Sequence, residues 1–201
     1  KIEFYEAALE GLSLPQKTIS PKFFYDERGS KIFDKICDTP EYYVTRTEIG
    51  LLNDIKEELY SLVEPGSVVV EYGCGSSIKI KALLSALPEP LHYIAIDISK
   101  SHLILTAQEI ASDYSNISVG AICADFMEPI DWPESANFDS SKRLAFFPGS
   151  TIGNLNPSQA IQFLKNARHL LGDDGTFLIG VDMKKDAKIF NQAYNDVEGH
   201  T

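Results

Sequence analysis

The chain has 201 residues and a formal net charge of −11. This length suits one globular domain with a sizeable core. No apolar run reaches the roughly 18–20 residues that a membrane span needs. A chain this acidic, without clustered Lys and Arg, is poorly suited to a phosphate backbone. We therefore expect small molecules or proteins as substrates, and neither nucleic acid nor membrane as a partner.

The cysteines are three in number and far apart: Cys37, Cys74 and Cys123. They show no CxxC spacing, so we expect no metal site. An odd, unpatterned set of cysteines is typical of a reducing compartment, which predicts a cytoplasmic location.

The first 63 residues read as a helical and aromatic segment. Ile32, Phe33 and Ile36 share one helical face, and Pro40 ends that helix. "TRTE" then has the form of a capping box, with Thr45 as N-cap and Glu48 three residues later.

After residue 63 the chain alternates between strand and helix. The expected strands are 67–73, 91–99, 117–126, 143–150 and 175–183, all rich in apolar and β-branched residues. Asn156 and Pro157 open a helix that Gly172 ends. This alternation predicts an α/β fold with a Rossmann-like, doubly wound and mostly parallel sheet. Ligands of such sheets bind at the carboxyl ends of the strands.

A glycine turn follows the first strand, in "EYGCGSSIK". The pattern is Glu71-x-Gly73-x-Gly75, and Ile78 stands where a dinucleotide fingerprint has its third glycine. Gly73 and Gly75 allow a ligand to approach the backbone closely. A turn of this kind also serves simply to reverse the chain, and Ile78 argues against an NAD(P)-linked oxidoreductase.

Acidic residues follow the next two strands. Asp97 lies where an acid of this architecture binds ribose hydroxyls. Asp125 is followed by Phe126, and an acid beside an aromatic ring suits an adenine base. Either acid can instead cap the helix that follows it. The succession of glycines, Asp97 and Asp125 at three strand ends favours a cofactor site over three separate caps.

This constellation resembles the class I S-adenosylmethionine-dependent methyltransferases, whose cofactor carries adenosine without phosphates. The segments "SPKFFYDERGSKIFDKICDTPEYYVTRTE", "FPGSTIGNLNP" and "DMKKDAKIFNQAYND" further resemble the histidine-specific Nα-methyltransferases of ergothioneine biosynthesis and their relatives acting on prenylated tryptophan. The resemblance runs from about Thr18 to Thr201. It implies S-adenosyl-L-methionine as cofactor and the α-amino group of an amino acid, with L-histidine first, as methyl acceptor.

The resemblance also implies roles for single residues. Those expected at the cofactor are Gly73, Gly75, Lys79, Asp97, Asp125 and Phe126. Those expected at the amino acid are Tyr25, Tyr42, Gly149, Asn154 and Tyr194, with Asn154 and Tyr194 holding the substrate carboxylate. No residue is assigned as a catalytic base. On the residues alone, Tyr25 and Tyr42 also fit ordinary core aromatics, and Asn154 fits a turn residue.

Members of this family continue beyond "YND", so the sequence is expected to lack the last strands and an inserted substrate domain. We divide it into a helical segment, 1–63, that covers the site, and a cofactor-binding core, 64–201. The strand 175–183 then becomes a sheet edge that favours self-association. The alternative functions are a cofactor-binding fragment without activity of its own and an enzyme acting on another amino acid, such as a tryptophan derivative.

Overall fold

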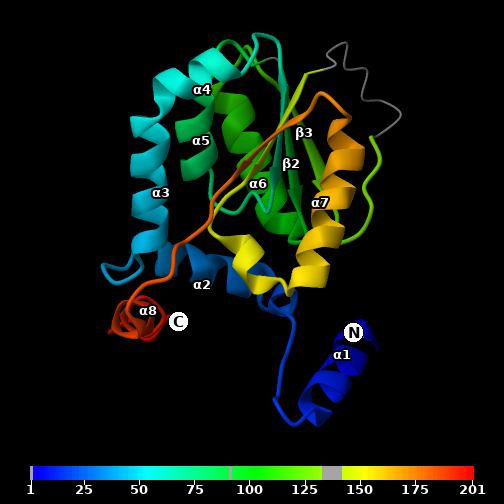
Figure 1. Cartoon of the computed structure of the whole chain (residues 1–201), viewed down its shortest axis with the longest axis vertical. Coiled ribbons are helices and arrows are strands. Elements are labelled where there is room, and N and C mark those ends of the chain that lie inside the picture. The colour runs from blue at the N-terminus through cyan, green and yellow to red at the C-terminus, as the bar shows by residue number, and fades with distance from the viewer. Residues whose placement is uncertain (1, 91, 133–141) are drawn as a thin grey trace.

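The structure is a computed structural model that describes residues 2–90, 92–132 and 142–201. At its centre is a parallel sheet with the strand order β3-β2-β1-β4-β5 (Figure 1). The strands are β1 Val68–Tyr72, β2 His92–Asp97, β3 Ser118–Cys123, β4 Arg143–Phe147 and β5 Thr176–Ile179. Every pairing between these described strands is parallel, which confirms the expected α/β class. Leu91, part of the expected second strand, lies outside the described residues.

The three central strands, β1, β2 and β4, are buried because helices lie on both faces of the sheet. The helices are α1 Ile2–Ser13, α2 Glu27–Asp38, α3 Tyr43–Asp54, α4 Lys56–Leu62, α5 Ile78–Leu84, α6 Lys100–Asp113, α7 Pro157–Leu171 and α8 Ala187–Ala193, with 3₁₀ turns η1 Pro21–Phe24 and η2 Thr151–Asn154. α5 and α6, with α3 and α4 outside them, pack on the face that carries Val69. α7 packs on the opposite face, with Val68 and Val70. The one-residue alternation of a strand therefore divides β1 between two cores.

The start of α7 confirms the local signals in the sequence. The Asn156 side chain accepts the backbone N–H of Gln159, and the Gln159 side chain accepts the backbone N–H of Asn156. Pro157 occupies the first turn, and Gly172 ends the helix with φ 80°. This reciprocal pair satisfies two donors that the helix itself leaves free.

The capping box expected at Thr45 is wrong. α3 already begins at Tyr43, so Thr45 lies buried inside the helix. Glu48 is then free to reach the sheet. The fifth strand also differs in detail, because β5 ends at Ile179 instead of continuing to Met183.

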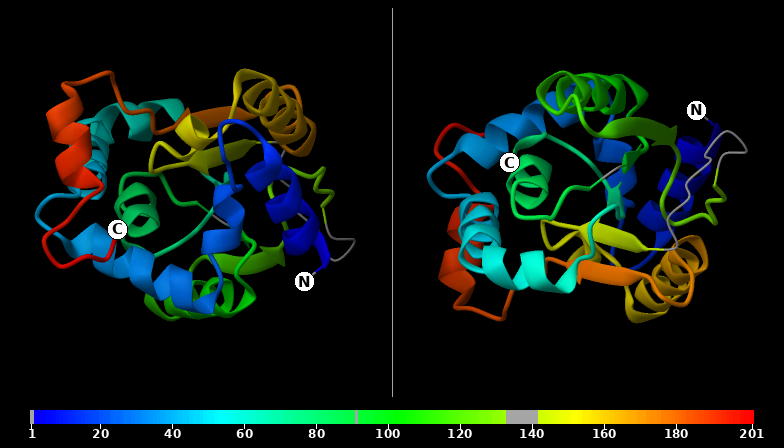
Figure 2. Two further views of the ribbon diagram at one scale, coloured as in Figure 1. Left: turned by 90° about the horizontal axis from the view of Figure 1, so that it is seen from below. Right: turned by 90° about the horizontal axis from the view of Figure 1, so that it is seen from above.

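The elements that precede β1 lie partly at the carboxyl end of the sheet. η1 and α2 cross that end, where η2 and α8 also lie, whereas α1 projects away from the sheet (Figures 1 and 2). α3 packs against α5, and α2 packs against both α3 and α6. In the part of the chain that is described, no helix combines the length and apolar character that crossing a membrane requires.

Candidate functional site

The glycine turn stands at the carboxyl end of β1, in the middle of the sheet. Gly73 and Gly75 have φ angles of +71° and +43°, which L side chains rarely adopt. The Gly73 N–H donates to the carbonyl oxygen of Ile96 in β2 at 2.8 Å. A Cβ built on Gly73 would meet no atom within 4 Å, so the turn faces open space. The turn thus offers a cradle that a side chain would fill.

Asp97 is the last residue of β2 and ties this turn to the next helix. One carboxylate oxygen accepts the Gly75 N–H at 3.4 Å, and the other accepts the Ser99 N–H at 2.8 Å. The Thr106 hydroxyl of α6 donates to the Gly75 carbonyl oxygen at 2.8 Å. Asp97 therefore holds the N–H of Ser99, the residue that precedes α6, but does not cap the helix itself, which has no side-chain cap. It also lies against the glycine turn, as the cofactor interpretation expects.

Asp125 lies two residues beyond the end of β3. One of its oxygens accepts the Met127 N–H at 3.0 Å, and the other is 2.9 Å from the ammonium of Lys22 in η1. Lys22 also pairs with Glu3 of α1 at 2.6 Å. The bond from Ala124 N–H to the Asp97 carbonyl oxygen, at 3.1 Å, holds the two acidic strand ends side by side.

Phe126 is expected at the cofactor, but its ring contacts lie in the hydrophobic core. Its ring lies 5.4 Å from that of Phe147 and 5.5 Å from that of Phe163, both edge-on. These contacts place it in the apolar cluster between β4 and α7.

An open cleft of about 640 Å³ adjoins the end of β2. Its lining comes from η1 and the start of α2 on one side and from residues 98–104 on the other, and it includes Lys22, Tyr25, Ile98 and Ser99. Ile98 directly follows Asp97. The cleft therefore gives an apolar ligand group room beside the carboxylate expected to bind ribose.

Glu71 lies buried beneath the glycine turn. The Tyr93 hydroxyl donates to its carboxylate at 2.6 Å. Burial raises the pKa of Glu71 to about 8. At neutral pH the protonated form therefore prevails, and this side chain holds a proton in the core below the site.

Lys79 and Gly149 are brought together by a residue that the sequence analysis did not assign to the site. The Glu48 carboxylate lies 2.9 Å from the Lys79 ammonium and accepts the Gly149 N–H with both oxygens at 2.9 Å. A Cβ on Gly149 would lie 3.0 Å from the Lys79 ammonium. The local sequence carries no signal for this role, because the role depends on α3 packing against the ends of β4 and β5.

The expected tyrosines form a chain of edge-on ring contacts. Tyr25 lies 5.6 Å from Phe33, Phe33 lies 6.1 Å from Tyr42, and Tyr42 lies 5.6 Å from Tyr194. Tyr42 is only 4% exposed and Tyr194 is 52% exposed. Burial raises the pKa of Tyr42 well above its ordinary value and also raises that of Tyr25. Both hydroxyls are therefore neutral donors at physiological pH.

Asn154 is the exposed last residue of η2. Among the described residues no hydrogen bond joins its side chain to Tyr194. The structure thus brings Tyr25, Tyr42 and Tyr194 into one chain of contacts and leaves Asn154 apart from them.

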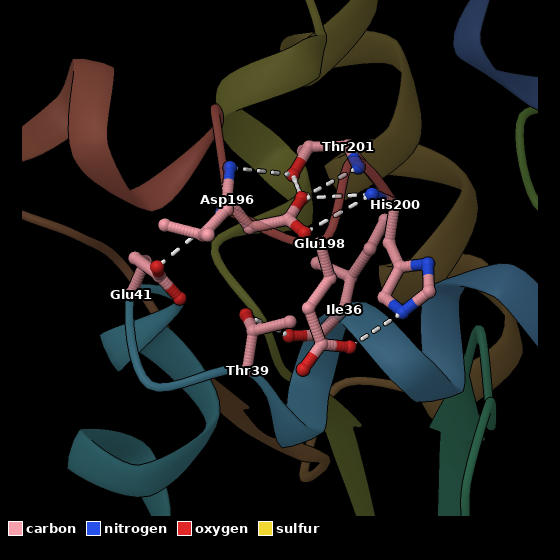
Figure 3. A network of polar contacts seen from close by, with 8 residues as sticks. Ile36, Thr39, Glu41, Asp196, Glu198, His200 and Thr201 are labelled. Carbon is pink, nitrogen blue, oxygen red and sulfur yellow. Dashed lines mark hydrogen bonds and ion pairs between the residues drawn. The ribbon is translucent and has the colours of Figure 1, made fainter.

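A folded loop follows Tyr194 and is organised by Asp196, which the sequence analysis did not single out. Its carboxylate accepts the N–H groups of His200 and Thr201 at 3.0 and 2.8 Å and also pairs with the Thr201 hydroxyl. These hydrogen bonds hold the pKa of Asp196 well below its ordinary value. The Val197 N–H donates to Glu41 at 3.4 Å, which ties the loop to the residue before Tyr42 (Figure 3).

The donor set fits a cofactor with an adenosine end and an amino-acid end. Gly73 leaves open space at the turn, the Asp97 carboxylate lies against that turn, and Lys79 offers a cation for a carboxylate. Lys79 and Asp125 are each paired within the chain, so a ligand that uses them has to share or replace those partners.

Comparison with known proteins gives one family. Residues 4–201 match the family described as "Histidine-specific methyltransferase, SAM-dependent". The chain is 37% identical over 195 residues to a histidine N-alpha-methyltransferase of Mycobacterium tuberculosis (strain CDC 1551 / Oshkosh), covering 95% of this chain and 59% of that protein. It is 33% identical over 180 residues to the ergothioneine biosynthesis protein 1 of Neurospora crassa, covering 88% of this chain and 20% of that protein. The chain thus spans about three fifths of the mycobacterial relative.

Among solved structures, the fold is similar to one from Methanococcus maripaludis described as an S-adenosyl-L-methionine-dependent methyltransferase. The TM-score is 0.51 at 18% identity, and the match covers 92% of this chain and 73% of that one. This likeness supports the fold.

Proposed function

Because the chain belongs to the family of histidine-specific, SAM-dependent methyltransferases, we propose that its protein methylates the α-amino group of L-histidine. The observation that carries this proposal is the set of groups found at the carboxyl ends of the sheet strands. There the open glycine turn, the Asp97 carboxylate, the Lys79–Gly149 cluster and the tyrosine chain gather within adjoining elements. The carboxyl edge is where such sheets bind ligands.

The proposed cofactor contacts follow from the chemistry of each group. Gly73 and Gly75 give room for the amino-acid part, Lys79 faces its carboxylate, and Asp97 accepts from the ribose hydroxyls. Asp125 accepts from the adenine amino group, after Lys22 moves aside. Phe126 belongs to this set through the family alone, since its ring packs in the core.

The proposed transfer is an in-line displacement. When bound, S-adenosyl-L-methionine supplies a methyl group already activated by its sulfonium. The cofactor would leave as the neutral thioether S-adenosylhomocysteine, so the task of this chain's residues is to hold the acceptor amine in line with the methyl group. The amine has to lose a proton to expose its lone pair, and its ordinary pKa lies near or above about 8.

The protein residues mainly position the amine. Tyr25 and Tyr42 carry neutral hydroxyls, so they act as hydrogen-bond partners and not as bases. The Gly149 backbone orients the lone pair, and Asn154 and Tyr194 hold the substrate carboxylate. Orientation of this kind supplies a large part of the barrier reduction in two-substrate reactions.

The proposal extends to organisation and location. We divide the chain at 63/64 into a helical segment over the site and a cofactor-binding core. Three free cysteines support a cytoplasmic location, and the charge of −11 supports a small-molecule substrate without nucleic acid or membrane as a partner.

β5 lies at one edge of the described sheet, which supports self-association through that edge.

Thermal shifts with a panel of amino acids, with and without S-adenosylhomocysteine, test the function. We expect S-adenosylhomocysteine to stabilise the chain, L-histidine to add to that shift, and mass spectrometry to detect methylated histidine with the full-length protein. Stabilisation by S-adenosylhomocysteine without any amino-acid effect or product identifies this chain as a cofactor-binding fragment. A larger effect of a tryptophan derivative than of histidine overturns the histidine assignment.

A further inference from the structure

Glu48 has no role in the function proposed above, yet it touches both halves of the site. Its side chain is 13% exposed, and that of its partner Lys79 is 11% exposed. The same carboxylate holds the Gly149 N–H with both oxygens. It also lies against the end of β5, because a Cβ on Gly180 would fall 1.9 Å from the nearer oxygen. One carboxylate of α3 therefore joins α5 to the ends of β4 and β5.

We propose that Glu48 is a positioning residue that balances the charge of Lys79 and fixes the Gly149 backbone, and so couples the cofactor half of the site to the amino-acid half. This inference rests on the proposed function for the identity of the two ligands.

The charge argument begins with the low exposure of Lys79. A cation so little solvated needs a counter-charge, and Glu48 supplies it at 2.9 Å. The carboxylate of an arriving cofactor has to compete with Glu48 for the same ammonium. Removing the charge of Glu48 leaves that ammonium to the ligand, so affinity rises for a ligand that places a carboxylate beside Lys79.

The geometric argument concerns Gly149. Its φ of +76° strains any residue with a side chain, and among the described residues the Glu48 carboxylate is the acceptor of its N–H. An amide at position 48 keeps one acceptor and turns an NH₂ group toward the Gly149 N–H. The loop proposed to orient the amine then loses its fixed position, so affinity for the amino acid falls.

The test is Glu48→Gln in the full chain, with both affinities measured by calorimetry. We expect S-adenosylhomocysteine to bind about tenfold more tightly than in the wild type. We expect L-histidine, titrated with S-adenosylhomocysteine present, to bind about tenfold more weakly. A merely structural role cannot move the two affinities in opposite directions. Unchanged or weaker binding of S-adenosylhomocysteine overturns the inference.

Glu109→Gln is the matched control. It removes one of the two acidic partners of Lys81, a lysine two residues further along α5, and leaves the other, Asp113, in place. Both ion pairs lie nearer the surface than that of Lys79. We expect both affinities to stay within about twofold of the wild type, as for other exposed pairs.

Glu48→Asp carries the test if the amide variant does not fold. Aspartate keeps the negative charge beside Lys79, but its shorter side chain cannot reach the Gly149 N–H as glutamate does. We therefore expect the affinity for S-adenosylhomocysteine to be retained and the affinity for histidine to fall. An equal loss of both affinities overturns the inference. If the wild type binds no histidine, the proposed function fails, and the S-adenosylhomocysteine arm still decides whether Glu48 balances Lys79.

Discussion

At the scale of single residues, the two proposed anchors of the substrate carboxylate differ in their support. Tyr194 packs edge-on against the buried Tyr42, so its ring has a fixed neighbour. Asn154 is exposed at the end of η2, just after Ser150 with its left-handed φ of 57°. Its position therefore depends on the loop backbone.

Replacing Asn154 by leucine tests its role. The apolar side chain cannot donate to a carboxylate, so we expect histidine affinity to fall about tenfold while S-adenosylhomocysteine affinity stays within about twofold. Calorimetry measures both. Asn116→Leu, at an exposed turn before β3, is the control and is expected to change neither. Equal losses for the two ligands in the Asn154 variant would reject the assignment.

The raised pKa of Glu71 gives a second prediction at this scale. The group titrates near pH 4.5 when unfolded and near pH 8 when folded. The folded state therefore holds a proton that the unfolded state has lost, and stability falls as pH rises from about 5 to about 8.

Glu71→Gln removes this proton linkage and keeps an acceptor for the Tyr93 hydroxyl. In the wild type, we expect the free energy of unfolding to fall by about a few kcal/mol between the two ends of that window because of Glu71. In the variant, this contribution to the fall should be absent. Urea titrations at pH 5.5 and pH 8 measure it. Glu57→Gln, on the exposed side of α4, should keep the wild-type slope. If Glu71→Gln shows the same dependence of unfolding free energy on pH as the wild type, Glu71 is not a buried, protonated carboxyl.

At the scale of elements, the loop after α8 is the clearest case of structure held by one side chain. Asp196 satisfies the backbone of His200 and Thr201, and Glu41 accepts from Val197 (Figure 3). The loop is thereby bound to the connection that carries Tyr42, and the spacing of Tyr42 and Tyr194 depends on it.

Asp196→Asn should loosen this loop, because the amide replaces one carboxylate oxygen that accepts N–H groups. We expect histidine affinity to fall roughly fivefold and cleavage by added protease to rise after Tyr194, with S-adenosylhomocysteine affinity unchanged. Asp54→Asn, at the exposed end of α3, is the control. Unaltered histidine binding and proteolysis in Asp196→Asn would show that the loop does not depend on this carboxylate.

The sequence predicted the elements whose causes are local. The apolar runs of β1 and β2 mark strands buried on both faces, and Asn156-Pro157 marks the start of α7. Glu48 and Asp196 could not be predicted, because their partners lie in other elements or depend on how the loop folds back. The Thr45 capping box was wrong for the same reason: packing of α3 against α5 extends the helix past the local signal.

At the scale of the whole molecule, β5 is an edge strand followed by exposed apolar residues. Val181 is 63% exposed and Met183 is 77% exposed. We expect the chain to associate as its concentration rises, and sedimentation velocity measures this. Val181→Lys places a charge beside the edge and should shift the chain toward monomer. Leu62→Lys, at the exposed end of α4, should not. A wild type that stays monomeric at all concentrations contradicts the prediction.

The single tryptophan gives the molecule a built-in optical probe. Trp132 donates from its indole nitrogen to the carbonyl oxygen of Leu170 at 2.8 Å, and the Arg143 guanidinium lies 4.7 Å from its ring. These two groups lie toward the opposite end of the sheet from the glycine turn. Emission from this indole should therefore follow global unfolding and remain silent when ligands bind, so fluorescence melts can separate loss of fold from loss of binding in each variant described above.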